Sequence, residues 1–173
     1  MGSPPTTRWT GAVLVVGCAL VTSCGYRPLV AEFPEGNGAV VIPTAGNHTP
    51  YAGLAGPLTD ALRTRAKISG IRVAAKGAPK LIVTIASVTS RAGSIGVDGN
   101  RLYPIDKVQT IKVVAFVEGS NGRVLVSEES FEAHGRSPAG DSVRTEAAME
   151  ASRRGGILDE IAEMIVSYMF YRY

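Results

Sequence analysis

The sequence predicts an α+β fold in which two helices pack on one face of a mixed sheet of about four strands, in the order β-α-β-β-β-α. Two segments, 80–91 and 107–119, read as strands whose more apolar face alternates with a mixed one, as Leu81, Val83 and Ile85 alternate with Ile82, Thr84 and Ala86. Two others, beginning near residues 56 and 141, carry apolar residues at helical spacing. Most strands follow one another without an intervening helix, which favours helices gathered on one side of the sheet.

The first 23 residues have the features of a lipoprotein signal peptide. Arg8 is the only charged residue before Cys24, and the apolar run 11–21 is too short for a membrane span, which needs about 20 apolar residues. The stretch VTSC, ending at Cys24, has the form of a lipobox. We therefore expect residues 1–23 to be a leader and Cys24 to carry lipid. The alternatives are cleavage at Cys18, which leaves little apolar core, or an ordinary signal peptide with two incidental cysteines.

The length and composition indicate a single domain with a small positive net charge. The chain has 18 Lys and Arg against 15 Asp and Glu, and loss of the leader removes only Arg8. Such a small positive charge, without a basic run, argues against a nucleic-acid partner. A leader cut before Cys24 also removes Cys18, so cysteine catalysis and cysteine-bound metal are not expected.

The region after the lipobox is expected to begin with a tether. Residues 24–37 contain Pro28, Pro34 and two glycines that oppose regular structure, so we assign them as an extended, lipidated segment. Residues 38–173 then form one predicted α+β domain. Its first elements are a short strand over 39–44 and a helix from Gly56 as N-cap and Pro57 at the first helical position.

The first helix is expected to end at Ser69-Gly70 and lead into 71–74, either a small strand or an extended return. We expect the first strand to have a parallel neighbour across this helix. After the strand 80–91, the glycine-rich stretch 91–100 is predicted to be a flexible loop. The Asn121-Gly122 turn joins the strand 107–119 to a strand over 123–131, which predicts a hairpin.

The last helix is predicted to start at Asp141 or Ser142 and to end near Tyr171. Its apolar residues are spaced by three or four positions, namely Leu158, Ile161, Ile165 and Met169. Gly155-Gly156 is expected to interrupt or bend this helix, because each glycine costs about 1 kcal/mol relative to alanine.

Residues that carry chemistry are sparse. His48 and His134 are the only histidines, and neither has a partner at metal-ligand spacing. No Gly-x-Ser-x-Gly nucleophile motif occurs. We therefore predict no catalytic residue, no metal and no cofactor, and a role other than that of an enzyme.

Basic residues gather around the ends of the two long strands. Arg91, Arg101, Lys107 and Lys112 flank or follow the predicted loop, and such side chains bind phosphate groups well. The alternative is that they are simply solvated strand ends.

Several stretches together resemble the family of LPS-assembly lipoproteins called LptE, in the divergent form of deltaproteobacteria-like lineages. They are CGYRPL, VVIPTAGNHTPYAGLAGPLTDALR, GSNGRVL and TEAAMEASRRGGILDEIAEMIVSYM. The resemblance implies a non-enzymatic lipoprotein that plugs the outer-membrane β-barrel LptD and helps move lipopolysaccharide to the outer leaflet. The four basic residues would then face lipid A phosphates.

The residue after Cys24 predicts the membrane to which the lipoprotein is sorted. Gly25 follows the lipidated cysteine where lipoproteins retained in the inner membrane carry aspartate. We therefore expect an acylated protein, anchored by its N-terminal lipid in the outer membrane and facing the periplasm. The alternative is an auxiliary lipoprotein of an ABC-type transport or secretion complex, since such proteins also begin with Cys-Gly.

Overall fold

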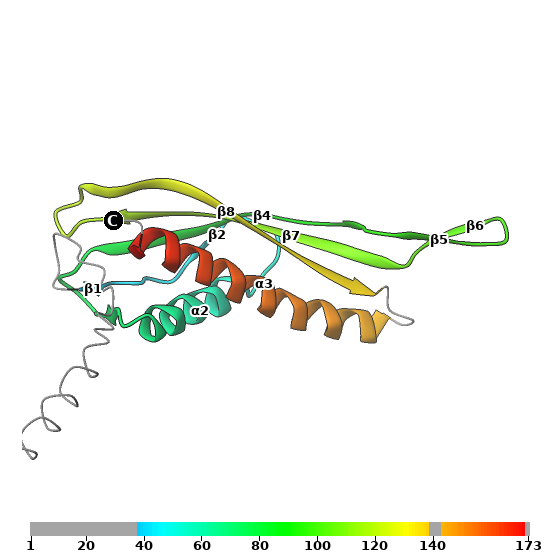
Figure 1. The fold of residues 1–173 in the computed structure, drawn as a ribbon, viewed down its shortest axis with the longest axis horizontal. Helices are drawn as coiled ribbons and strands as arrows, with labels where there is room; N and C mark the ends of the chain where they lie inside the picture. Colours follow the sequence, from blue (N-terminus) through cyan, green and yellow to red (C-terminus); the bar gives the residue numbers. More distant parts are fainter. Residues whose placement is uncertain (1–37, 139–142, 172–173) are drawn as a thin grey trace, which may run out of the picture.

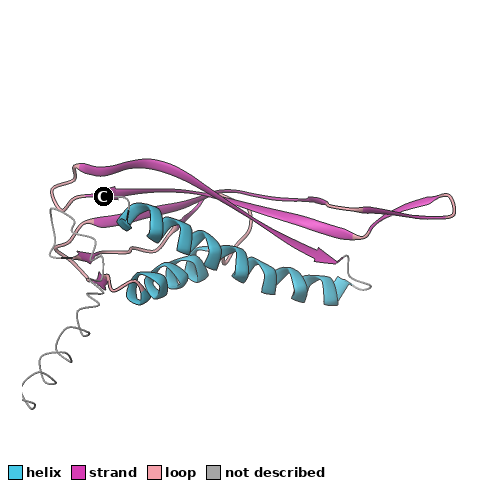
Figure 2. Cartoon of the chain, in the orientation of Figure 1, coloured by secondary structure: helices cyan, strands magenta, loops and turns pink. Residues whose placement is uncertain are grey.

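The computed structural model describes residues 38–138 and 143–171, and the predicted leader 1–23 and tether 24–37 lie outside them. Two helices cover one face of a long, twisted sheet, and a narrow two-stranded hairpin projects from one end (Figures 1 and 2). In chain order the elements are β1 (Ala39–Val40), β2 (Gly46–Asn47), α2 (Ala55–Ile68), β3 (Arg72–Val73), β4 (Lys80–Ala92), β5 (Ile95–Asp98), β6 (Arg101–Pro104), β7 (Asp106–Glu118), β8 (Val124–Pro138) and α3 (Val143–Tyr171).

The main sheet has four strands in the order β2-β4-β7-β8. Its first pair is parallel and the others are antiparallel, so the sheet is mixed, and the predicted fold class is confirmed. The core lies between the sheet and the helices. It is built from alternating residues of β4 and β7 and from the apolar stripes of both helices, including Leu81, Ile85, Ile111, Val113, Leu58, Leu62, Ile161, Ile165 and Met169.

The first predicted strand is shorter than expected. β1 covers Ala39–Val40 and pairs in parallel with β3, as the sequence predicted for a neighbour across the helix. Directly after β1, Val41 forms a parallel bridge with Lys80 at the start of β4. At Ile42 and Ala45, side chains of α2 take the place of a strand partner. Arg63 donates from Nη2 to the Ile42 carbonyl at 2.9 Å, and the Ala45 N–H donates to Thr59 Oγ1 at 2.9 Å. Backbone groups satisfied in this way need no sheet.

Both helices differ from the prediction in detail. α2 begins at Ala55 with Leu54 as N-cap, so the predicted cap at Gly56 was wrong. Pro57 still falls in the first turn, where its missing N–H is tolerated because those positions lack an intrahelical acceptor. α3 runs through Gly155-Gly156, so the predicted interruption was wrong. A bend or weak spot at these glycines stays a prediction. Buried residues directly after the glycines supply packing that offsets their weak propensity. The predicted caps Asp141 and Ser142 lie outside the described residues.

The predicted flexible loop 91–100 is wrong, because the strand ladder continues through it. Gly93 N–H donates to the Asp106 carbonyl and Ile105 N–H donates to the Ser94 carbonyl, both at 2.9 Å. These bonds join the β4–β7 ladder to the β5–β6 ladder in one continuous register. Gly99, with φ of 59°, supplies the left-handed conformation that a tight hairpin turn requires. We call the two-stranded portion 93–105 the arm.

β8 is also longer than predicted. It extends past Phe131 to Pro138, where it pairs with Asp106 at the base of the arm. Beyond that point the arm has only two strands, and Figure 1 shows it reaching past the ends of the helices.

Candidate functional site

Strand register separates the four basic residues that the sequence brought together. Arg91 pairs with Val108 and Lys112 pairs with Ser87, and both project from the sheet face opposite the helices, here called the outer face. Lys107 pairs with Ala92 on the alternate, helix-side face. Arg101 pairs with Asp98 at the turn of the arm. By the alternation of the ladder, Arg101 belongs to the same face as Lys107.

Spacing along the ladder separates these residues further. Lys112 lies four pairs from Arg91, which is about 13 Å along a strand. Arg101 lies seven pairs beyond Arg91 in the other direction, or about 23 Å. The four residues therefore form a line along the ribbon, on two faces, and do not make one compact patch. Whether any of them contacts phosphate stays a prediction.

A fifth basic residue lies close to Arg91. Val108 pairs with Arg91 on β4 and with Arg136 on β8, so one row across the outer face reads Arg91–Val108–Arg136. Two strand spacings place the Cα atoms of the arginines about 10 Å apart. Long guanidinium side chains at this separation can reach a single phosphate group and bind it with parallel hydrogen bonds.

The rows of the outer face that contain Lys112 and Thr110 are less positive than the Arg91–Val108–Arg136 row. Lys112 pairs across the strands with Glu132, whose carboxylate lies 3.7 Å from His134 Nε2. His134 Nδ1 in turn lies 2.8 Å from Thr110 Oγ1. Within the described part of the chain, no acidic side chain forms an ion pair with Arg91 or Arg136, and both are exposed. The Arg91–Arg136 pair is therefore better placed than Lys112 to receive an anion.

Sequence reasoning missed Arg136 because the last strand was expected to stop at Phe131. Alternation continues beyond that residue, since Phe131, Ala133 and Ser137 are buried while Glu132 and Arg136 are exposed. The small residues Ala133 and Gly135 weaken the apolar signal. Gly135 is required to be small, because a Cβ there would lie 2.6 Å from Arg153 Cδ on α3.

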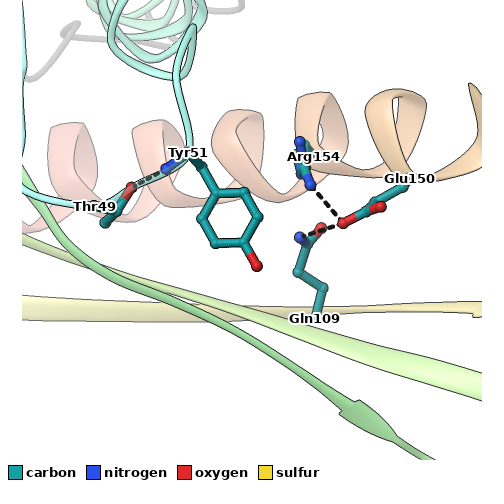
Figure 3. Close-up of polar contacts among 5 residues, drawn as sticks. All are labelled: Thr49, Tyr51, Gln109, Glu150 and Arg154. Atoms are coloured by element: carbon teal, nitrogen blue, oxygen red, sulfur yellow. Dashed lines mark hydrogen bonds and ion pairs between the residues drawn. The ribbon is translucent and has the colours of Figure 1, made fainter. Parts of the chain in front are cut away.

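A polar network fixes the helix-side face near the base of the arm (Figure 3). Gln109 on β7 is 3% exposed and donates from Nε2 to Glu150 on α3 at 3.3 Å. Arg154 forms an ion pair with the same carboxylate and lies 5.0 Å from the ring centroid of Tyr51. The network joins sheet, helix and the loop before α2, so its contribution is to hold the base of the arm in place.

The described residues lack two other kinds of site. Among residues 38–138 and 143–171, no three His, Cys, Asp or Glu side chains gather in a way that would hold a metal ion. No helix in the same part of the chain is long and apolar enough to cross a membrane. Cys24, the predicted lipidation site, lies outside the described residues.

Comparison with known proteins gives a likeness in fold. No family model and no curated protein sequence matches the chain. Among solved structures, it is similar to a minor lipoprotein from Acinetobacter baumannii, with a TM-score of 0.55 and 13% identity, over 80% of this chain and 94% of that one. It is also similar to the rare lipoprotein B from Shewanella oneidensis, with a TM-score of 0.54 and 14% identity, over 75% and 92% of the two chains.

A third similar structure is the PelC dodecamer from Paraburkholderia phytofirmans, with a TM-score of 0.53 and 14% identity, over 77% of this chain and 89% of that one. Identities this low establish a shared architecture and nothing finer. The fold is thus one that occurs in bacterial lipoproteins of different names, and their functions do not carry over with it.

Proposed function

We propose that this protein is a lipid-anchored lipoprotein of the outer membrane that occupies and supports a β-barrel of the LptD type during lipopolysaccharide assembly. The observation that carries the proposal is the combination of a lipobox at Cys24 with a fold that occurs in bacterial lipoproteins, among them rare lipoprotein B. The choice of the barrel and of lipopolysaccharide as partners rests on the sequence resemblance to the LptE family.

The shape of the domain supports a role in contact with a partner. Both described helices lie on one face of the long sheet, so among the described residues no helix covers the outer face or the arm (Figure 2). The outer face presents Arg91 and Arg136 without acidic partners among the described residues. In the proposed role this row contacts the phosphate groups of lipopolysaccharide, and Lys112 adds a weaker positive field beside Glu132.

Depletion of the protein from cells tests this role. If it supports a barrel, its loss lowers the amount of correctly assembled barrel in the outer membrane, measured by the heat-dependent gel mobility of the barrel. An unrelated outer-membrane barrel in the same cells serves as the control. Unchanged barrel assembly after complete depletion contradicts the proposal.

The second candidate is an auxiliary lipoprotein of an ABC-type transport or secretion complex. The fold favours neither role, because it is shared by lipoproteins of different names and by a chain that forms a dodecamer. The two roles differ in the partner, which lies in the outer membrane in one case and in the inner membrane in the other.

A further inference from the structure

The arm exposes an aliphatic surface on the same side of the ladder as the arginine row. The register pairs Ile95 with Pro104 and Val97 with Leu102, and these four residues, here the apolar quartet, project together from the arm. Ile95, Val97 and Leu102 are 61%, 68% and 73% exposed. They are among the most exposed large apolar residues in the described chain, although Ile68 on α2 is similar at 72%.

Among residues 38–138 and 143–171, no element covers this surface. Figure 1 shows the arm beyond the reach of both helices, and β8 ends where the arm begins. A two-stranded hairpin has no second layer to pack against and is only marginally stable in water. The exposed aliphatic side chains of the arm are therefore not part of a hydrophobic core. The quartet is no larger than the largest apolar patch of an ordinary monomer, so its position on an uncovered ribbon and the charges beside it carry the argument, not its area.

The chemistry of the quartet favours lipid over protein as the occupant. Leu and Val, two of the four residues of the quartet, are under-represented among the energetically important residues of protein interfaces. A stable protein interface also buries about 800 Å² on each partner. Four aliphatic side chains on a narrow ribbon offer only a few hundred Å². A bilayer surface needs no such area, because a small apolar face inserts at the boundary of headgroups and acyl chains.

Charge complementarity favours an anionic lipid. Among the described residues, two arginines outnumber the one carboxylate between them and the quartet, Asp106, which accepts a hydrogen bond from the Ser94 N–H. Arg91 and Arg136 lie on the same set of the ladder as the quartet, and Ile95 is four residues, or about 13 Å, from Arg91. Arginine side chains of this length keep their guanidinium groups at headgroup level while neighbouring apolar groups go deeper. The turn of the arm is polar, with Asp98 paired to Arg101, which suits a hairpin lying on the surface rather than one driven in tip first.

We propose that the outer face of the arm docks on an anionic bilayer, with the apolar quartet in the interface and Arg91 and Arg136 on lipid phosphates. This goes beyond the function proposed above, since it requires no barrel. The described chain begins in β1, at the end of the molecule opposite the arm (Figure 1). A lipid on Cys24 would tether the chain independently of the arm, and tethering raises the effective concentration of the arm at the membrane.

Vesicle binding by the mature chain, residues 24–173 with Cys24→Ala, isolates the arm from the lipid anchor. We expect this chain to co-sediment with phosphatidylglycerol vesicles and to bind phosphatidylcholine vesicles much less. Val97→Ser with Leu102→Ser should lower the partition coefficient by about tenfold, because the most exposed aliphatic contacts are lost. Ile68→Ser is the matched control, since Ile68 is as exposed but lies on α2, and it should leave binding unchanged.

A fluorescent probe gives an independent readout. The only tryptophan of the chain, Trp9, is in the predicted leader, so Leu102→Trp in the mature chain has a single indole. Its emission should shift to the blue with phosphatidylglycerol vesicles, whereas Ile68→Trp should not shift. Equal binding by the Val97→Ser, Leu102→Ser variant would overturn the proposal. So would a change in oligomeric state in that variant without vesicles, which would mean that a second copy covers the quartet.

Discussion

Arg91 on β4 and Arg136 on β8 flank the same residue, Val108, on the outer face of the sheet. They are 45 positions apart in the chain and become neighbours only because two antiparallel pairings share β7. Val108 is 8% exposed although it projects from the face opposite the helices. Alkyl stems of flanking arginines can shield such a residue while their charged ends stay in water.

Charge reversal at both arginines should weaken lipopolysaccharide binding. For Arg91→Glu with Arg136→Glu we expect a loss of about tenfold or more, since a hydrogen bond to a charged group contributes about 1.5–3 kcal/mol. The free energy of unfolding should change by less than about 0.5 kcal/mol, because both side chains are exposed. Titration of purified protein with lipopolysaccharide measures the first quantity and urea unfolding measures the second.

The control for that titration is a variant with the same change in net charge elsewhere. Lys76→Glu with Arg123→Glu reverses two exposed charges away from the arginine row. This variant should bind lipopolysaccharide nearly as well as the parent protein in moderate salt, which screens distant charges. An equal loss in both double variants would mean that binding follows net charge and not this row.

Replacement of Cys24 by alanine should block lipidation, because the thiol is the group that accepts the lipid. The chain should then accumulate as an unprocessed precursor or leave the membrane fraction, since stable anchoring needs more than one acyl chain. Fractionation and metabolic labelling with palmitate measure both effects. A mature-length Cys24→Ala protein that remains on membranes in high salt would show that lipid on this residue is not the anchor.

Two glycines, Gly135 on β8 and Gly156 on α3, should respond in opposite directions to an added methyl group. At Gly135 a Cβ would lie 2.6 and 2.7 Å from Arg153 and 2.8 Å from the buried Ile157, so Gly135→Ala should cost about 1–3 kcal/mol. At Gly156 nothing lies within 4 Å of an added Cβ, so Gly156→Ala should stabilise the helix by about 1 kcal/mol. Urea unfolding of both variants decides the matter, and the same sign for both would contradict the packing described.

The polar network at the base of the arm should matter more than an exposed ion pair. Glu150→Ala removes the acceptor of both Gln109 and Arg154 and should cost about 1–2 kcal/mol, because the buried Gln109 amide loses its partner. Glu163→Ala breaks only the exposed 3.1 Å pair with Arg65 and should cost less than about 1 kcal/mol. Thermal unfolding of the two variants should rank them in this order, and the reverse order would assign the network no structural role.

The elements with a regular pattern over many residues could be predicted from the sequence. The two-residue period over 80–91 and 107–119, the Asn121-Gly122 turn and the apolar stripe ending at Met169 predicted the two long strands, the hairpin that follows them and the last helix. Register shifts after Ile85 and Ala115 interrupt that period. Those patterns are strong because each residue on one face packs in the same core. The class of fold follows from their order.

The arm and the arginine row were not predicted, for two physical reasons. Glycines at 93, 96 and 99 suggested a flexible loop, although Asp98-Gly99 between Val97 and Leu102 is a hairpin signal. Gly96 is instead a strand residue whose missing side chain makes room for Tyr103 across the ladder. Arg136 became a site residue through strand pairing, and register between distant segments is a tertiary property that spacing along the chain does not encode.

Purification of the tagged, lipidated protein from membranes in mild detergent, with identification of its partner, tests the central claim most directly. The proposed function predicts a large outer-membrane β-barrel of the LptD type in near-equal amount, retained in moderate salt because the net charge is small. The Cys24→Ala chain serves as the control for membrane carry-over. Recovery of inner-membrane transporter subunits without any barrel would contradict the account and support the alternative complex.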